Sequence, residues 1–340
     1  MKAVLLVGGF GTRLLPLTET VKKELLPLVD RPILDHVLDH LVRHGVTEVV
    51  MSSPYLEAAF HPFIEARQGE PSITWITESE PLGTGGAIVQ ALSALGDEPF
   101  FALNGDILTD LDLTAMREAH RSRGADVSIA LQHVDDARAF GLVETDADGR
   151  VWAFREKPAD LVPGDVNAGT YLIDPAVLAP WSADRAISIE REIFPAVIEA
   201  GRHVAGFLTD PYWIDLGTPE KYLQAHFDLL SGRVEGLDYP APWMHPTADV
   251  DLRSRLGRWV SVGVEARVGA EAELDDCVIH PGATVAAGAR VLRSIIGPGA
   301  RVGEGAIVVG CVLGAGARIR DGVSVEDRKV GTDEEITASG

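Results

Sequence analysis

The sequence predicts an α/β protein of two unlike parts: a mostly parallel sheet with helices over residues 1–230 and a parallel β-helix over residues 259–330, joined by a linker over 231–258. Two observations predict this division. In the first part, short apolar runs alternate with helical patterns. From Val262 onward, aliphatic residues follow a fixed repeat instead. At 340 residues, the chain also exceeds the usual size of a single domain.

The first part contains eight short apolar runs that predict buried strands. They lie at 4–7, 48–51, 73–76, 100–103, 127–131, 141–144, 151–155 and 169–173. Apolar residues at three- and four-residue intervals predict helices at 33–43, 86–95, 113–123 and 219–230. Strands and helices in alternation favour a mostly parallel sheet covered by helices.

The linker is indicated by the proline-rich run Tyr239-Pro240-Ala241-Pro242-Trp243. After it, aliphatic residues stand at 262, 268 and 274, and the same triplet begins again at 279, 296 and 313, at a constant interval. Small or β-branched residues follow four positions later, and glycines occupy the turns. A triangular β-helix needs one inward aliphatic residue on each side and a small residue at each corner. The pattern therefore predicts four coils of near-hexapeptide steps.

The two cysteines, Cys277 and Cys311, occupy the same coil position, because two full periods of this repeat separate them. Two layers of a β-helix separate their backbones by roughly 9–10 Å, which is beyond the reach of a disulfide. We expect both to be reduced.

The net charge of −21 argues against a nucleic-acid or anionic-membrane partner, since both require a basic face. No apolar run approaches the roughly 18 residues that cross a bilayer. The N-terminus lacks the features of a signal peptide, which predicts a cytoplasmic protein.

A glycine loop, Gly8-Gly9-Phe10-Gly11-Thr12-Arg13, follows the first predicted strand. Such a loop lets backbone N–H groups approach phosphate oxygens, and Lys23 is close enough in sequence to add a second cation beside Arg13. Each feature has a structural alternative. The glycines could only turn the chain, and Lys22-Lys23-Glu24 could be a solvated charged turn.

Two aspartates are candidate metal ligands. Asp106 follows the strand at 100–103, at the edge where open α/β sheets bind ligands. Asp215 stands alone in an apolar run, where burial is costly without a compensating cation. Mg²⁺ takes few protein oxygens and completes its shell with water and phosphate, so two carboxylates suit it. The alternatives are an Asx turn at Asp106 and a helix cap at Asp215.

Another predicted strand ends in Arg155-Glu156-Lys157-Pro158. Here Glu156 could accept bonds from sugar hydroxyls and Lys157 could hold a sugar phosphate, or both could simply be an exposed strand end.

These motifs occur in a familiar order along almost the whole chain. The set comprises Gly8–Arg13 with Lys23, Pro81-Leu82-Gly83-Thr84-Gly85-Gly86, Asn104-Gly105-Asp106, Phe140-Gly141, Glu156-Lys157-Pro158, Asn167-Ala168-Gly169, Ser188-Ile189-Glu190 and 213–217. Together they resemble the sugar-phosphate nucleotidyltransferase family, closest to mannose-1-phosphate guanylyltransferases with a C-terminal left-handed β-helix. The resemblance implies a Rossmann-like nucleotidyltransferase domain, an NTP and a sugar 1-phosphate as substrates, and Mg²⁺ as cofactor.

The resemblance also implies a role for each matching residue. Arg13, Lys23, Asp106 and Asp215 would be catalytic, with Asp106 and Asp215 holding Mg²⁺. The nucleotide would contact Gly8, Gly9, Gly11, Thr12, Arg13, Glu78, Pro81, Gly83 and Thr84. The sugar phosphate would contact Gly141, Glu156, Lys157 and Asn167.

The identity of the base follows from hydrogen bonding. Guanine presents two adjacent donors that a carboxylate can accept, and Glu78 stands where uridylyl- and thymidylyl-type relatives tend to carry glutamine, which favours GTP. In contrast, Lys22-Lys23-Glu24 stands where mannose-specific relatives usually have Pro-Lys-Pro. The run Lys23-Glu24-Leu25-Leu26-Pro27-Leu28-Val29-Asp30-Arg31-Pro32 looks more like bacterial UTP–glucose-1-phosphate uridylyltransferases. A UTP- or dTTP-dependent enzyme acting on glucose 1-phosphate is therefore an alternative, as is a non-catalytic regulatory homologue.

The β-helix could in principle be an acyltransferase, but it has four predicted coils and one histidine, His280, which we expect in an exposed turn. Packing and homo-oligomer formation are its expected roles, because stacked coils leave a hydrogen-bonding end to cover. Truncation near residue 258 is expected to disturb assembly and stability more than chemistry.

Overall fold

The computed structural model describes residues 1–54, 57–67 and 69–338. The chain forms two compact units, and neither is continuous in sequence. Unit 1 contains Met1–Gly9 and Val37–Trp213, and unit 2 contains Phe10–His36 and Ile214–Gly340. The segment Phe10–His36, called the signature segment below, therefore groups with the β-helix, although the sequence predicted a single division near residue 230.

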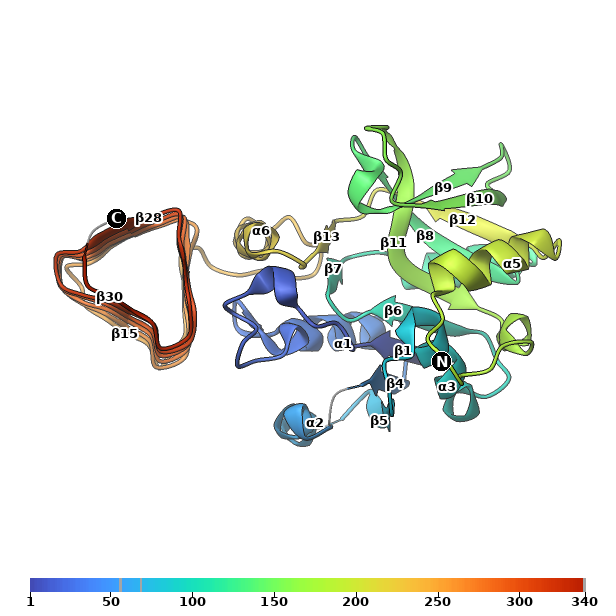
Figure 1. The fold of residues 1–340 in the computed structure, drawn as a ribbon, viewed down its shortest axis with the longest axis horizontal. Coiled ribbons are helices and arrows are strands. Elements are labelled where there is room, and N and C mark those ends of the chain that lie inside the picture. The colour runs from blue at the N-terminus through green and yellow to red at the C-terminus, as the bar shows by residue number, and fades with distance from the viewer. Residues whose placement is uncertain (55–56, 68, 339–340) are drawn as a thin grey trace. The chain divides into compact units, whose positions relative to one another are not determined.

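Unit 1 is built on a sheet whose main path runs β10-β9-β11-β6-β1-β4-β5, with β8 beside β11 and β12 beside β8 (Figure 1). Its strands are β1 (Lys2–Leu6), β4 (Glu48–Ser53), β5 (Ser72–Thr77), β6 (Phe100–Asn104), β8 (Val127–Val134), β9 (Gly141–Thr145), β10 (Val151–Glu156), β11 (Gly164–Ile173) and β12 (Val204–Leu208). Every strand predicted in this part is present, with bounds that differ by a few residues. β7 (Ile107–Thr109) lies outside this sheet.

The sheet is mixed rather than mostly parallel. β1 pairs in parallel with β4 and β6, and β4 with β5. β11, in contrast, runs antiparallel to β6, β8 and β9, and β10 runs antiparallel to β9. For β9 and β10 the reason is visible in the chain: the connection between Thr145 and Val151 is too short for the crossover of a dozen or more residues that a parallel pair requires.

Helices cover both faces of this sheet. They are α1 (Ile33–Arg43), which begins in unit 2, α2 (His61–Ala66), α3 (Gly83–Leu95), α4 (Leu113–Arg123), α5 (Phe194–Glu199), the π-helix η6 (Ile189–Ile193) and the short 3₁₀ turns η3 (Glu57–Ala59), η4 (Ala137–Ala139) and η5 (Pro175–Leu178). α3 packs on β1 and β4, α4 on β8 and β12, and α5 on β10. The core between them contains Ile88, Phe100 and Phe194, all with 0% exposure. No helix among the described residues is both long enough and apolar enough to cross a bilayer.

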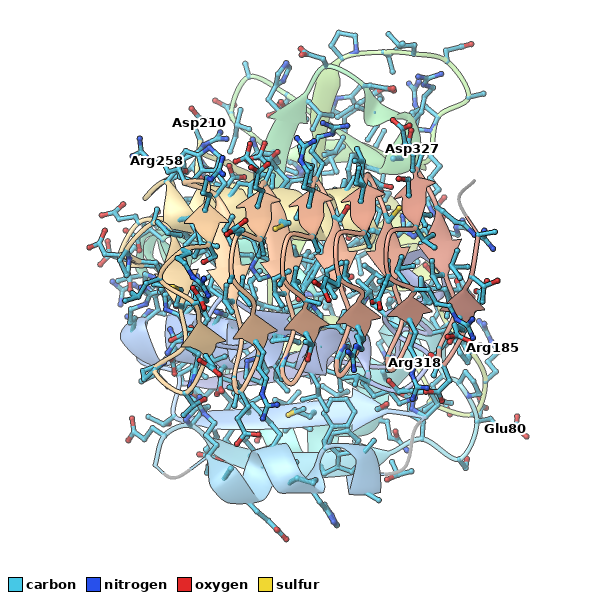
Figure 2. All side chains as sticks on the ribbon, turned by 90° about the vertical axis from the view of Figure 1, so that its left-hand side faces the viewer. Glu80, Arg185, Asp210, Arg258, Arg318 and Asp327 are labelled. Carbon is cyan, nitrogen blue, oxygen red and sulfur yellow. The ribbon has the colours of Figure 1, made fainter. Side chains whose placement is uncertain are left out.

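Unit 2 contains a left-handed parallel β-helix whose coils appear as a triangle in Figure 1 and as stacked rows of strands in Figure 2. Its first sheet is β14 (Trp243–Met244), β17 (Val260–Val262), β20 (Cys277–Ile279), β23 (Ile295–Ile296), β26 (Val312–Leu313) and β29 (Lys329–Val330). Its second is β15 (Asp249–Val250), β18 (Arg267–Val268), β21 (Thr284–Val285), β24 (Arg301–Val302), β27 (Arg318–Ile319) and β30 (Glu335–Ile336). Its third is β16 (Arg255–Leu256), β19 (Glu273–Asp275), β22 (Arg290–Leu292), β25 (Ile307–Val309) and β28 (Ser324–Glu326).

The interior of the β-helix follows the predicted repeat. Val262, Val268 and Leu274 are at most 2% exposed, as are their equivalents from Ile279 to Val330. Cys277 and Cys311 are buried free thiols, which confirms the expectation from the coil spacing.

The first coil begins at Trp243, inside the segment expected to be a linker. Met244 pairs with Val262, and Val262 pairs with Ile279 in the following coil. The first of these two steps is one residue longer than the second, so the repeat cannot be extended back into the first coil. The last strand, Glu335–Ile336, also lies beyond the expected end at residue 330.

The remainder of unit 2 consists of short elements. These are η1 (Thr12–Leu14), η2 (Lys23–Leu25), β2 (Pro27–Leu28), β3 (Arg31–Pro32), the end of β13 (Trp213–Asp215), and α6 (Pro219–Leu230). The N-cap of α6 is Thr218, whose hydroxyl accepts a hydrogen bond from the Lys221 N–H. α6 packs on β20 of the β-helix.

Candidate functional site

The glycine loop leaves β1 and continues into the signature segment. A Cβ on Gly8 would lie 2.8 Å from Cδ of the Pro54 ring, so the close approach of this rigid ring favours glycine. Gly11 has φ 63, in the left-handed region, and its carbonyl accepts a hydrogen bond from the Thr18 hydroxyl at 2.8 Å. Thr12 and Arg13 are exposed at the start of η1. Their side chains are therefore available to a ligand.

Unit 2 brings Arg13 and Asp215 together beside Gly217. A Cβ atom on Gly217 would lie 2.5 Å from Nη2 of Arg13 and 2.9 Å from Oδ1 of Asp215. The second carboxylate oxygen of Asp215 accepts a hydrogen bond from Lys221 Nζ at 3.2 Å. Asp215 does not cap α6, because Thr218 does. The carboxylate of Asp215 therefore lies near two cationic side chains, those of Arg13 and Lys221.

Sequence analysis did not identify Lys221. Its signal was available, since it stands three residues after the helix cap Thr218, in the first turn of α6, where a long side chain can reach back over the N-terminus. Lys23 was identified, and it lies beside Gly11: a Cβ on Gly11 would be 3.5 Å from the Cβ of Lys23. The cations Arg13, Lys23 and Lys221 thus all belong to unit 2.

Unit 1 places Asp106 in the tight turn between β6 and β7, at the carboxyl end of β6. The turn is fixed by the Gly105 N–H, which donates to the Leu6 carbonyl at 3.0 Å. Beside it, Gly169 has φ 70, and a Cβ there would lie 2.6 Å from Nδ2 of Asn104. The motifs Asn104-Gly105-Asp106 and Asn167-Ala168-Gly169 are therefore in contact.

A chain of hydrogen bonds in unit 1 connects the predicted nucleotide and sugar residues. The Thr84 hydroxyl donates to Oε2 of Glu190 at 2.8 Å, and the Tyr171 hydroxyl donates to Oε1 of Glu190 at 3.4 Å. Nδ2 of Asn167 donates to the Tyr171 oxygen at 2.7 Å, while Oδ1 of Asn167 accepts from the Gly169 N–H at 2.9 Å. Tyr171 and Glu190 were not assigned roles from the sequence, although Glu190 belongs to a quoted motif.

Glu78 is almost fully buried, with 5% exposure, and both of its oxygens are engaged. Oε1 accepts from the Ser52 hydroxyl at 3.0 Å and Oε2 accepts from the Leu82 N–H at 2.8 Å. Glu78 therefore braces the turn that leads into α3, while Glu80 is exposed and projects outward in Figure 2. Contact of Glu78 with a base would use the remaining lone pairs of its oxygens.

The turn before α3 passes very close to the segment around Ile187. Pro81 is exposed in this turn, and Gly83, at φ 69, begins the helix. A Cβ on Gly83 would lie 2.7 Å from the Ile187 carbonyl oxygen, and the Gly85 N–H donates to the same carbonyl at 2.8 Å. This packing lets α3 start at residue 83, earlier than the predicted start at residue 86.

The remaining sugar residues lie where β9 and β10 pair. Gly141 pairs with Glu156, and the Lys157 N–H donates to the Phe140 carbonyl at 2.9 Å. Lys157 is exposed and has φ 52. The Phe140 ring contacts the ring of Trp213, whose Nε1 donates to the Ala168 carbonyl at 2.9 Å. The side chain of Glu156 lies outside the part of the chain that the structure describes.

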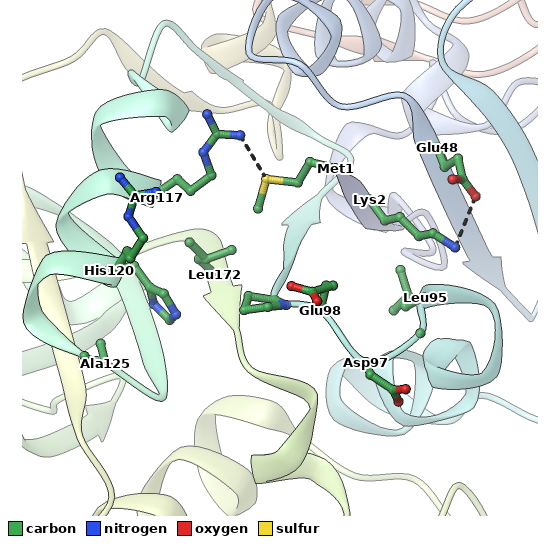
Figure 3. A pocket seen from close by; sticks show the side chains of 14 residues that line it. Met1, Lys2, Glu48, Leu95, Asp97, Glu98, Arg117, His120, Ala125 and Leu172 are labelled. Atoms are coloured by element: carbon green, nitrogen blue, oxygen red, sulfur yellow. Dashed lines mark hydrogen bonds and ion pairs between the residues drawn. The ribbon is translucent and has the colours of Figure 1, made fainter.

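A pocket of about 790 Å³ in unit 1 is separate from all of these residues. Figure 3 shows its lining, which includes Lys2 at the start of β1, Glu48 at the start of β4 and Arg117 on α4. Lys2 donates to the Ala94 carbonyl and pairs with Glu48 at 3.2 Å. The pocket lies at the amino ends of β1 and β4, whereas Gly8, Glu78 and Asp106 follow the carboxyl ends of β1, β5 and β6, where open α/β sheets bind ligands.

Comparison with known proteins gave matches over nearly the whole chain. The Nucleotidyl transferase family matches residues 2–232, and the GMPPB C-terminal domain matches residues 239–340. A mannose-1-phosphate guanylyltransferase of Mycobacterium tuberculosis is 38% identical over 306 residues, covering 86% of this chain and 83% of the relative. A probable mannose-1-phosphate guanylyltransferase 2 of Arabidopsis thaliana is 35% identical, with the same coverage of 86% and 83%. Among solved structures, HddC from Yersinia pseudotuberculosis, complexed with GMP-PN, is similar with a TM-score of 0.58 and 29% identity, covering 66% of this chain and 97% of that one.

Proposed function

The chain belongs to the nucleotidyl transferase family, and from this premise we propose that it joins mannose 1-phosphate to GTP, releasing pyrophosphate and forming GDP-mannose. The observation that carries the proposal is the approach of both Arg13 and Asp215 to Gly217, in a chain similar over 86% of its length to mannose-1-phosphate guanylyltransferases.

In the proposed reaction, a phosphate oxygen of the sugar phosphate attacks the α-phosphorus of the nucleotide in line with the departing pyrophosphate. No protein nucleophile is required, so the chain contributes position and charge. Arg13 and Lys23 hold the triphosphate and neutralise the pyrophosphate as it leaves. Gly8, Gly9, Gly11 and Thr12 let the backbone approach the phosphates.

The sugar phosphate is assigned to the residues around β9, β10 and β11. Lys157 holds its phosphate, while Gly141, Glu156 and Asn167 contact the sugar. The hydrogen-bond chain from Asn167 through Tyr171 and Glu190 to Thr84 supports this assignment, because it fixes the Asn167 amide relative to the turn that contacts the nucleotide. Glu78, Pro81 and Gly83 belong to that turn and are assigned to the base.

Asp106 and Asp215 are assigned to Mg²⁺, and their chemistry fits that ion. Both offer carboxylate oxygens, which are the hard ligands that Mg²⁺ prefers, and the ion needs only one or two of them. Within the described residues, no three His, Cys, Asp or Glu side chains gather into a metal-binding group, so a site dominated by protein ligands is not expected. Bound Mg²⁺ would neutralise phosphate charge and act as a Lewis acid.

A substrate panel tests the proposal. GTP, UTP, dTTP and ATP are each combined with mannose 1-phosphate or glucose 1-phosphate, and pyrophosphate release is measured with Mg²⁺ and again after chelation. The proposal expects the highest kcat/KM for GTP with mannose 1-phosphate, and loss of activity on chelation. A higher kcat/KM for UTP or dTTP with glucose 1-phosphate would show that these, and not GTP and mannose 1-phosphate, are the substrates. If no combination releases pyrophosphate, the result would favour a non-catalytic regulatory homologue.

The proposal also includes a cytoplasmic location and assembly of the chain into a homo-oligomer. Light scattering of the purified chain, and of a variant altered on the open face of the first coil, tests the second point.

A further inference from the structure

One corner of the β-helix carries glycine at four of six equivalent positions and histidine at the other two. The residues that follow β14, β17, β20, β23, β26 and β29 in the first sheet are His245, Gly263, His280, Gly297, Gly314 and Gly331. At three of these glycines an added Cβ would lie 3.0 Å or less from backbone atoms of the next coil. Glycine is therefore the residue that this corner favours. His245 lies in the first coil and is only partly buried, so the fully buried His280 is the exception that requires a reason.

His280 is also not the exposed turn residue that the sequence suggested, since it is 1% exposed. Its Nε2 lies 3.0 Å from the hydroxyl oxygen of Tyr222 on α6, and the Tyr222 hydroxyl contacts the carbonyl oxygen of Pro27. The bonds have one consistent direction: Nε2–H of His280 donates to Tyr222, and the Tyr222 O–H donates to Pro27. This direction leaves Nδ1 of His280 unprotonated, and within the described residues Nδ1 has no hydrogen-bond partner.

Burial maintains the protonation states that these bonds need. Desolvation lowers the pKa of His280 to about 4, so its imidazole is neutral near pH 7. Desolvation likewise raises the pKa of Tyr222, which keeps its hydroxyl protonated. The ring of Tyr222 is further packed against His226, with ring centroids 4.9 Å apart.

Pro27 closes the turn that carries Lys23. The Leu26 N–H donates to the Lys23 carbonyl at 3.1 Å, and the Leu26 carbonyl accepts from the Ile33 N–H at 3.0 Å. The hydrogen bond from the Tyr222 hydroxyl to the Pro27 carbonyl, which follows directly, therefore fixes the end of the turn that carries Lys23.

The same corner of the β-helix contacts the signature segment at two further points. A Cβ on Gly314 would lie 3.1 Å from the Cβ of Pro16, and Oε2 of Glu19 accepts from the Thr332 N–H at 3.1 Å. Pro16 and Glu19 closely follow Arg13 in sequence. The β-helix thus holds the signature segment both before and after the turn that carries Lys23.

We propose that His280 and Tyr222 are positioning residues for the nucleotide: through the hydrogen bonds from His280 to Tyr222 and from Tyr222 to Pro27, the β-helix fixes the turn that presents Lys23 to the triphosphate. This inference rests on the proposed function, which assigns Lys23 to the triphosphate. It makes the β-helix part of the binding machinery, in addition to any role in assembly.

Two variants test the inference without requiring a new backbone shape. Tyr222→Phe removes the hydroxyl but keeps the ring, and His280→Gly introduces the residue that four of the equivalent positions carry. Each is expected to raise the KM for the nucleotide about five- to tenfold, the loss expected for one buried hydrogen bond, while the KM for the sugar phosphate changes less than twofold. Because both variants break one chain of bonds, the double variant is expected to be no worse than the more affected single variant.

Ser294→Ala is the matched control. The Ser294 side chain is buried in the β-helix, and its hydroxyl donates to the Leu292 carbonyl at 2.6 Å and accepts from the Cys311 N–H at 3.0 Å, both within the coils. Its loss is expected to lower the melting temperature without raising the nucleotide KM. His280→Gln, which keeps an N–H donor, is expected to recover part of the nucleotide affinity that His280→Gly loses.

Amide hydrogen exchange provides a readout that does not depend on the substrate. Exchange at Leu25 and Leu26 is expected to accelerate in Tyr222→Phe and His280→Gly but not in Ser294→Ala. If the wild-type protein shows no pyrophosphate release but exchange at Leu25 and Leu26 is still faster in the two variants, the proposed function is overturned. The role of His280 and Tyr222 in fixing the Lys23 turn is then kept. Unchanged exchange and an unchanged nucleotide KM, with only a lower melting temperature as in Ser294→Ala, would overturn the positioning role itself.

Discussion

The ammonium group of Lys221 lies 3.2 Å from Oδ2 of Asp215. The other oxygen of the same carboxylate faces Gly217, where the Arg13 guanidinium also lies. Asp215 thus sits between two cations before any ligand binds. Since like charges repel, a metal ion at Asp215 would bind against the field of Lys221.

Replacing Lys221 by methionine is therefore expected to lower the Mg²⁺ concentration needed for half-maximal pyrophosphate release. The pair is partly exposed, so a discounted interaction of about 1 kcal/mol, or roughly fivefold in Mg²⁺ affinity, is expected. Calorimetric titration of Mg²⁺ checks the same shift without turnover. Lys2→Met is the matched control, because Lys2 pairs with Glu48 at the same distance, 3.2 Å, in unit 1. A raised Mg²⁺ requirement in Lys221→Met would mean that Lys221 orients Asp215 rather than competing with the ion.

Gly217→Ala is expected to impair catalysis without unfolding the protein. The new methyl group would lie 2.5 Å from Nη2 of Arg13 and 2.9 Å from Oδ1 of Asp215, so both side chains must move. They are flexible and can do so at little cost in stability, but a displacement of about 1 Å in an active site can cost roughly 100-fold in rate. Steady-state kinetics and thermal unfolding measure the two effects. Normal kcat/KM would show that the positions of Arg13 and Asp215 beside Gly217 do not matter for the reaction.

Glu78→Gln tests the assignment of the base. It is expected to weaken the use of GTP far more than that of UTP, because the amide replaces an acceptor oxygen by a donor. Ser52→Ala serves as the control, since it removes the hydrogen bond from Ser52 to Oε1 but leaves the carboxylate. If Glu78→Gln lowers the turnover of GTP and UTP by the same factor, as Ser52→Ala does, the assignment of Glu78 to the base is wrong. Glu78 then only stabilises the turn before α3.

Stability is expected to fall as the pH is lowered from about 6.5 towards 4. Burial lowers the pKa of His280 to about 4 and that of His40 to about 3, so the unfolded chain binds protons in this range that the folded chain does not. The contribution of each neutral, buried histidine to stability is complete above the unfolded pKa of about 6.5. For each of the two histidines, the free energy of unfolding is expected to fall by about 2 kcal/mol between pH 7 and pH 5. Urea denaturation at several pH values measures the slope. His40→Leu should flatten it, and an equally steep slope in that variant would exclude His40 as a source.

Much of the fold could be predicted from local sequence patterns. The bounds of α1, α4 and α6 agree with the helical spacing of their apolar residues, and the constant repeat located the inward residues of the β-helix. The start of the β-helix could not be located in this way. Because the first coil is one residue longer, the repeat aligns Val262, Val268 and Leu274 with positions 245, 251 and 257, none of which is aliphatic.

The candidate site was predictable where its residues form contiguous motifs. Long-range partners were not, since nothing local in the sequence connects Arg13 to Gly217, Tyr222 to His280, or Thr84 to Glu190. The grouping of the signature segment with the β-helix and α6 has the same cause, because it depends on contacts between residues that are 195 and 313 positions apart. The expectation that truncation near residue 258 disturbs assembly and stability more than chemistry stays a prediction, and such a truncation would also remove the contacts of His280 and Thr332 with Tyr222 and Glu19.

The most direct test of the account is a magnesium titration of Asp106→Asn and Asp215→Asn with GTP and mannose 1-phosphate, using Asp112→Asn, an exposed helix cap that asparagine replaces well, as the control. The account predicts that either site variant loses about 100-fold or more in turnover at limiting Mg²⁺, while the control behaves as the wild type. Full turnover of either site variant at limiting Mg²⁺ would contradict it.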